Sequence, residues 1–338
     1  MTFILAIAGT IAWAFLPLMS EHTVWLGIIL RALAGVVIGG FSSVIPMYIV
    51  ELAPPEATGF FGSLNQLGVT IGVTLCYVSG IFCGWQMIAV VGSAIALTLA
   101  LIIWYIPESP VSGKTAIVDD PASSWEIFRG KWLCKTIVCM LLMVFQQFCG
   151  VNAILTNLSD LFSDAGVTLD INVASTITSI AQVISVLIGG FLIEKIGRRW
   201  TWIVSFGGLT IADLLYALCR HERLQKRFPR WFPIADVFLF LLAYGLGGGP
   251  IPWFVASEMF PPELRPAAAS AVSVSNWSMV FVVVEAFPYV KKAMGDFGCF
   301  LVFTVFSLIG TIFGVFYITD PKDHIGESTE LITDAREF

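Results

Sequence analysis

Residues 247–270 read GGGPIPWFVASEMFPPELRPAAAS, an apolar segment that is broken by small and cyclic residues and then ends in charge. In a helix interior, glycine costs about 1 kcal/mol and proline about 3 kcal/mol relative to alanine. A helix here is therefore expected to weaken and bend. The residues of this predicted hinge are Gly247, Gly248, Gly249, Pro250 and Pro252. The charged end of the segment carries Glu258, Glu263 and Arg265.

The composition places this segment in a membrane protein. Of the 338 residues, 57% are hydrophobic and 12% are charged, whereas about 25% are charged in a soluble domain. The mean hydropathy is +0.86. Backbone that faces lipid must satisfy its own hydrogen bonds, so we expect an all-α membrane protein. Ten apolar runs are long enough to cross a bilayer, at about 3–19, 24–50, 60–82, 86–106, 133–155, 173–193, 200–219, 233–257, 268–290 and 298–318.

The charged end of the opening stretch has a second copy in the chain. ELAPPEATG at 51–59 follows the second apolar run, and EMFPPELRP at 258–266 follows the eighth. This offset of six runs predicts two parallel repeats of six helices, a duplication found in transporters. The first repeat then lacks two helices, so we expect an N-terminally incomplete chain: a fragment, a splice form or a faulty gene model. The predicted domains are an incomplete bundle at 1–106, a short linker at 107–132, a six-helix bundle at 133–318 and a tail at 319–338.

Charge and motif content restrict the function classes. The net charge of −6 provides no basic face for a nucleic-acid partner. The cysteines lack metal-ligand spacing, and no nucleophile has a candidate base, so we expect no metal, no cofactor and no enzyme. An even number of spans places both termini on one side. The face with the linker and the tail carries more lysine and arginine than the other face, which favours the cytoplasm for it.

Five motifs together resemble the sugar porter branch of the major facilitator superfamily, and the facilitative glucose transporters in particular. They are PMYIVELAPPEATGFFGSLNQLG (46–68), PESP (107–110), QQFCGVN (146–152), EKIGRR (194–199) and GGGPIPWFVASEMFPPELRPAA (247–268). The resemblance implies the major facilitator fold with ten of its twelve transmembrane helices, helices three to twelve. It also implies facilitated diffusion of a hexose such as glucose by alternating access, in a multi-pass protein of the plasma membrane. The oligomeric state is left open.

The resemblance further implies a central hexose site. Sugar hydroxyls both donate and accept hydrogen bonds, which suits the amides of Asn and Gln. The implied substrate-binding residues are Gln66, Gln146, Gln147, Asn152, Gln182, Trp253 and Asn276. Gln146 and Asn152 are six residues apart, so they do not share one face of a regular helix. We therefore expect the helix to break near Gly150, which would turn both side chains inward. As an alternative, such amides hydrogen-bond one membrane helix to another, and each of these bonds stabilises the pair by about 0.6 kcal/mol on average. The alternative for Trp253 is that it anchors the chain at the membrane interface.

Charged residues at the cytoplasmic ends of the spans form a second implied group. By the resemblance, they pair across the two halves when the transporter faces outward and separate when it opens inward. They are Glu51, Glu194, Arg198, Arg199, Glu258 and Arg265. Positive-inside anchoring explains Arg198 and Arg199 equally well, but it does not explain the carboxylates.

Three of the charges inside predicted spans are taken as functional candidates, because a charge is costly there. These are Arg31, Asp213 and Glu285. The chain also departs from the family pattern at Thr58, Thr156, Asn157 and Gly245, which replace charged or aromatic family residues. Two alternatives to transport therefore remain open: a non-transporting sugar sensor or regulatory partner, and an inactive fragment. Which hexose is bound, and whether protons are coupled, also remain open.

Overall fold

The computed structural model describes residues 2–18, 21–109, 124–158, 171–229 and 231–318, and these residues form helices and connecting turns without a β-strand. Seven helices are long and apolar enough to cross a membrane, and Thr2–Leu18 adds a shorter apolar helical stretch. Two of the seven contain a sharp change of direction. The described residues therefore form ten helical segments, which agree with the ten predicted spans.

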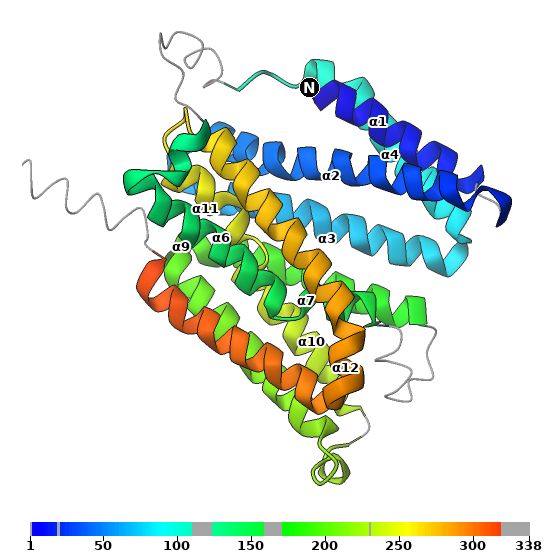
Figure 1. Cartoon of the computed structure of the whole chain (residues 1–338), viewed down its shortest axis with the longest axis vertical. Coiled ribbons are helices and arrows are strands. Elements are labelled where there is room, and N and C mark those ends of the chain that lie inside the picture. The colour runs from blue at the N-terminus through cyan, green and yellow to red at the C-terminus, as the bar shows by residue number, and fades with distance from the viewer. Residues whose placement is uncertain (1, 19–20, 110–123, 159–170, 230, 319–338) are drawn as a thin grey trace, which may run out of the picture.

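The N-terminal helices are α1 (Thr2–Phe15), α2 (Val24–Leu52), α3 (Thr58–Phe82) and α4 (Trp85–Ile102). Short 3₁₀ turns connect or extend them: η1 (Leu16–Leu18), η2 (Glu21–Thr23), η3 (Pro55–Ala57) and η4 (Ile103–Tyr105). Helix α1 packs against both α2 and α4 (Figure 1). Between 11% and 17% of the apolar windows of α2, α3 and the α4–η4 segment are buried, so these helices expose most of their apolar surface.

The C-terminal helices start with η5 (Ser124–Phe128) and α6 (Gly130–Phe148). They continue through α7 (Val151–Thr156), α9 (Ile171–Arg220), η6 (Gln225–Arg227), α10 (Phe232–Ala243), the π-helical turn η7 (Tyr244–Gly248), α11 (Ile251–Met259) and α12 (Arg265–Tyr317). Between 39% and 67% of their apolar windows are buried. The packed core of the molecule therefore lies among these helices, around Leu142, Trp202, Phe206 and Phe254.

Three glycines with positive φ set the path of the C-terminal helices. Gly150 (φ +87) ends α6 and starts α7, which is the break that the sequence predicts. Gly197 (φ +88) and Gly295 (φ +68) turn the chain inside α9 and α12. Figure 1 shows α12 doubling back on itself after the turn. Glycine adopts this left-handed conformation at no steric cost, so it marks each turn.

The N-terminal and C-terminal helices meet mainly where α3 packs on α9 and α2 packs on α12. Glycines allow this close approach. A Cβ atom on Gly62 would lie 2.5 Å from the ring of Phe254, and one on Gly190 would lie 2.6 Å from Ser63 Oγ. Ser42 and Ser273 hydroxyls lie 2.9 Å apart and join α2 to α12.

Candidate functional site

The broken helix α10–η7–α11 lies at the centre of the candidate site. Within it, the Gly249 N–H donates to the carbonyl of Tyr244 at 2.9 Å, a π-type bond. Pro250 and Pro252 have no N–H, so they cannot bond to the carbonyls of the preceding turn. The carbonyl of Gly248, which lies four residues before Pro252, therefore needs another donor.

Gln146 supplies that donor. Its Nε2 donates to the carbonyl oxygens of Gly248 and Gly249, both at 2.8 Å. The side chain is 1% exposed. Gln146 was predicted to bind the sugar, and in this structure its amide nitrogen holds the backbone of the predicted hinge.

The neighbouring amides form a chain that joins three helices. Gln147 Nε2 donates to Asn276 Oδ1 at 2.6 Å, and Asn152 Nδ2 donates to Gln147 Oε1 at 2.5 Å. Gln147 Nε2 also lies 3.3 Å from Gln146 Oε1. The break at Gly150 returns Asn152 toward Gln147 and makes the contact possible. The structure thus brings four of the predicted sugar ligands together, from α6, α7 and α12.

Two further predicted ligands remain unengaged. Gln66 on α3 and Gln182 on α9 are 6% and 3% exposed. Among the described residues, neither side-chain amide makes a hydrogen bond. Gln66 lies against the hinge, because a Cβ atom on Gly249 would be 3.1 Å from Gln66 Cγ. Trp253 on α11 is partly buried and packs on the edge of the C-terminal core.

Most of the predicted charge network gathers at one end of the molecule, which we call the charged end (Glu51, Thr58, Glu194, Arg198, Glu258 and Arg265). Arg198 binds Glu258 in a bidentate way, from Nε at 2.9 Å and from Nη2 at 2.5 Å. Arg198 Nη2 also donates to Thr58 Oγ1 at 2.8 Å, which crosses from α9 to α3. The Phe60 N–H donates to Glu194 Oε1 at 2.9 Å and makes a second crossing.

The remaining members of the network are looser. Arg265 Nη1 lies 4.0 Å from Glu51 Oε1, and Arg265 Nε donates to the carbonyl of Phe260 at 3.0 Å. The Ser109 hydroxyl donates to the Glu51 carboxylate. Arg199 does not join the network: its Nε is buried and has no hydrogen-bond partner among the described residues. Thr58, which stands where the family pattern has a charged residue, accepts a hydrogen bond from Arg198.

The three predicted intramembrane charges lie on different helical segments and do not form one site. The Arg31 guanidinium lies over the ring of Trp13, 5.5 Å from its centroid. Asp213 is fully buried in α9, and its Oδ2 accepts from the Ser307 hydroxyl at 2.9 Å. Glu285 is exposed on α12.

Sequence reasoning missed a second buried carboxylate, Asp236 on α10. It is 4% exposed, and Oδ1 of both Asp213 and Asp236 has no hydrogen-bond partner among the described residues. Asp236 lies inside the predicted span 233–257 and in the first turns of α10. The rule that singled out Asp213, a charge inside a predicted span, could have found it.

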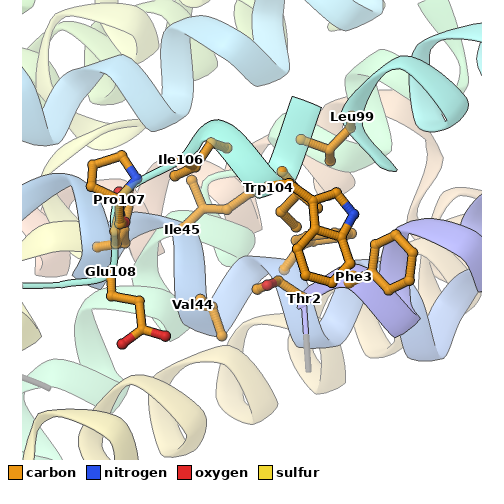
Figure 2. A pocket seen from close by; sticks show the side chains of 12 residues that line it. Thr2, Phe3, Val44, Ile45, Leu99, Trp104, Ile106, Pro107 and Glu108 are labelled. Carbon is orange, nitrogen blue, oxygen red and sulfur yellow. The ribbon is translucent and has the colours of Figure 1, made fainter. Parts of the chain in front are cut away.

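A cavity of about 580 Å³ lies between α1, α2 and the end of α4 (Figure 2). Trp104 and Phe3 line it with their rings 5.0 Å apart, and Glu108 lies on its wall. The wall is otherwise largely apolar, and none of the predicted sugar-binding residues line it. Its chemistry therefore differs from that of the amide cluster formed by Gln147, Asn152 and Asn276.

A family model and curated relatives both match this chain to sugar transporters. The family described as "Sugar (and other) transporter" matches residues 1–113 and 112–326. The facilitated trehalose transporter Tret1-1 of Drosophila simulans is 29% identical over 338 residues, which cover 89% of this chain and 39% of that protein. The chain spans about two fifths of the length of the first curated relatives it matches.

Solved structures match the fold. The major facilitator superfamily proton:xylose symporter XylE bound to 6-bromo-6-deoxy-D-glucose has a TM-score of 0.78 at 19% identity, over 94% of this chain and 80% of that chain. The inward open conformation of XylE from E. coli has a TM-score of 0.68 at 19% identity, over 95% and 79%. At this identity, the likeness identifies the fold and leaves the substrate undetermined.

Proposed function

Because the chain belongs to the sugar porter family of the major facilitator superfamily, we propose that it carries a hexose across a membrane by facilitated diffusion. The route is alternating access, in which two helix bundles rock about a central site and make no covalent bond to the sugar. The two bundles are the N-terminal helices (1–106) and the C-terminal helices (133–318).

The amide cluster is the observation that carries this proposal. Gln147, Asn152 and Asn276 are held in one place by their mutual hydrogen bonds. Gln66 on α3 lies against Gly249, and Gln182 on α9 lies beside Gly245, so the two bundles each bring an unengaged amide to the broken helix. An amide that both donates and accepts suits the hydroxyls of a neutral sugar. Trp253 adds an aromatic face for the apolar side of the sugar ring.

The contacts at the charged end support a conformation in which the transporter is closed at that end. Two side-chain contacts, Arg198 to Thr58 and Glu194 to Phe60 N–H, hold α9 against α3. We assign the charged end, the linker and both termini to the cytoplasm, and the protein to the plasma membrane.

Uptake into liposomes tests the proposal. Vesicles containing this chain should take up D-glucose faster than L-glucose, and Trp253→Ala should reduce the stereoselective uptake about tenfold, which corresponds to about 1.4 kcal/mol in the activation free energy of uptake. Trp231→Ala, which changes an exposed tryptophan just before α10, is the matched control.

The choice of sugar is tested in the same vesicles. Excess D-glucose, D-xylose and trehalose are added in separate arms, and D-glucose should compete most strongly. Stronger competition by trehalose would replace the hexose assignment with a disaccharide. Saturable sugar binding without any uptake would overturn transport and support the sensor alternative, which the replacement of two gate aromatics by Thr156 and Asn157 motivates.

A further inference from the structure

Ser205, on α9 beyond the Gly197 turn, contacts the π-helical turn through its side chain. Its side chain is fully buried. The hydroxyl accepts a hydrogen bond from the Gly248 N–H at 2.8 Å and donates one to the carbonyl of Ala243 at 2.7 Å. A hydroxyl can do both at once. The Ser205 side chain therefore bridges two backbone groups that lie five residues apart in the turn.

The backbone of the turn lies directly on α9 at this point. A Cβ atom on Gly247 would be 2.9 Å from the carbonyl oxygen of Thr201. One on Gly248 would be 3.2 Å from both Ser205 Oγ and Phe206 Cε2. The glycines of the hinge thus serve a second purpose besides flexibility, because they let the Ser205 hydroxyl reach the backbone.

Gly248 is held on both sides by side chains from other helices. Its N–H bonds to Ser205 on α9, and its C=O accepts from Gln146 on α6. A side chain that enters a helix ladder is a recognised cause of kinks. Bending the helix at this point would move Gly248 relative to α6, α9 or both, so it must lengthen or break at least one of these bonds.

We propose that Ser205 and Gln146 form a clamp on the π-helical turn, and that this clamp must open when α11 moves relative to α10. Ser205 is the positioning residue of the clamp. Gln146 connects it to the amide cluster, because Gln146 Oε1 lies 3.3 Å from Gln147 Nε2. The consequence for transport rests on the function proposed above, whereas the clamp itself does not.

Hydrogen–deuterium exchange tests the clamp without any transport assay. In Ser205→Ala the Gly248 N–H loses its acceptor, so exchange in the segment 243–250 of the full chain in nanodiscs should become about 5-fold faster, the factor expected for one typical hydrogen bond. Ser205→Thr keeps a hydroxyl and should restore slow exchange. Ser257→Ala is the matched control, because Ser257 is equally buried and its Oγ has no partner among the described residues.

Two outcomes of the exchange experiment bear directly on the clamp. Equal exchange in wild type and Ser205→Ala would overturn the clamp. Faster exchange throughout the protein, including the buried segment 139–145, would mean that Ser205→Ala destabilises the whole fold. In that case Ser205→Cys, which has a weaker hydrogen-bonding group of similar size, replaces Ser205→Ala. Its faster exchange must then be confined to 243–250 for the clamp to stand.

Flux measurements test the link to transport. Ser205→Ala should change the maximal rate of sugar flux by about 3-fold or more and the sugar dissociation constant by less than about 2-fold, since the loss of one hydrogen bond acts on the hinge and not on the sugar. Ser205→Thr should restore the rate. A local exchange effect with unchanged flux would overturn the role of the clamp in transport. A local exchange effect in a chain that never transports would overturn the proposed function and leave the clamp standing.

Discussion

At the scale of single residues, the amides of the site fall into two groups. Gln147 is bonded on both sides and holds α6, α7 and α12 together without any ligand. Gln182 has no such role among the described residues. Helix joining and sugar binding are alternatives for each amide in the sequence, and the contacts of Gln147 and Gln182 differ in this structure. Substitutions at the two kinds of position should therefore have different effects.

Asn276→Ala and Gln182→Ala make this difference measurable. Asn276→Ala removes the acceptor at 2.6 Å from a buried amide, so it should lower the free energy of unfolding by about 1–3 kcal/mol and also weaken sugar binding. Gln182→Ala should weaken binding and leave the melting temperature in detergent unchanged within about 2 °C. Thermal unfolding and quenching of tryptophan fluorescence by sugar measure the two effects. Equal losses of stability in both variants would contradict the grouping.

Asp213 is a fully buried carboxylate that accepts a hydrogen bond from the Ser307 hydroxyl. Asp213→Asn keeps an oxygen that accepts from the Ser307 hydroxyl, and it removes the need to bury an acid. We expect its free energy of unfolding to stay within about 1 kcal/mol of wild type. Asp213→Ala leaves Ser307 without its partner and should lose about 1–3 kcal/mol. Thermal unfolding compares the two variants, and a larger loss in the asparagine variant would show that an ionised carboxylate is needed.

At the scale of elements, glycine decides where helices break and where they touch. At Gly150 both requirements coincide, because φ is +87 and a Cβ atom would lie 2.5 Å from the ring of Phe303. At Gly189 on α9 the requirement is contact alone, since a Cβ atom would lie 2.2 Å from the carbonyl oxygen of Leu246. Backbone cannot move aside as a flexible side chain does, so this contact between α9 and the π-helical turn is sensitive to substitution.

Gly189→Ala tests that contact, and Gly207→Ala is its control on the same helix. Gly189→Ala should lower the free energy of unfolding by about 1–3 kcal/mol through overpacking. A Cβ atom on Gly207 would meet nothing within 4 Å, so Gly207→Ala should be neutral or stabilise by up to about 1 kcal/mol. Melting of the purified proteins gives both values. A Gly189→Ala protein as stable as Gly207→Ala would mean that α9 and the turn are further apart than described.

At the scale of the whole molecule, the two bundles are joined at the charged end by few polar contacts. The bidentate pair of Arg198 and Glu258 lies within the C-terminal helices and orients the guanidinium so that it reaches Thr58 on α3. The side chains of this pair are 7% and 14% exposed, so water screens the pair less than it screens a surface pair. The pair therefore contributes to closure of this end without itself crossing between the bundles.

Glu258→Gln should open the charged end. Without Glu258 to orient it, the Arg198 guanidinium should lose its charge-assisted hydrogen bond to Thr58 on α3. Loss of about 1.5–3 kcal/mol across the two bundles corresponds to a shift of about tenfold or more in the ratio of closed to open molecules. Spin labels at the exposed positions Glu56 and Lys195, in a background without exposed cysteines, report the distance between the bundles. Glu263→Gln, an exposed carboxylate after the same helix, is the control. An unchanged distance distribution in Glu258→Gln would separate this pair from closure.

Composition and local patterns determined the class of fold. Ten apolar runs of bilayer length, the repeated Glu-x-x-Pro-Pro-Glu motif and the glycines near positions 150 and 247–249 are readable along the chain, because the length of an apolar run and the conformational freedom of glycine are local properties. Local motifs also identified the candidate amides for the site. They could not show which role each amide has, since these roles depend on partners far away in the sequence.

Only the tertiary structure decided which groups meet. Gln146 bonds to a backbone 102 residues away, Arg198 reaches Thr58 across 140 residues, and Ser205 enters a turn 43 residues ahead. Ser205 belongs to no motif, so nothing local distinguishes it from other serines in apolar helices. A buried donor or acceptor takes whichever partner the packed helices bring within about 3 Å. That partner is set by how helices cross, and the crossing depends on the whole molecule rather than on any one segment.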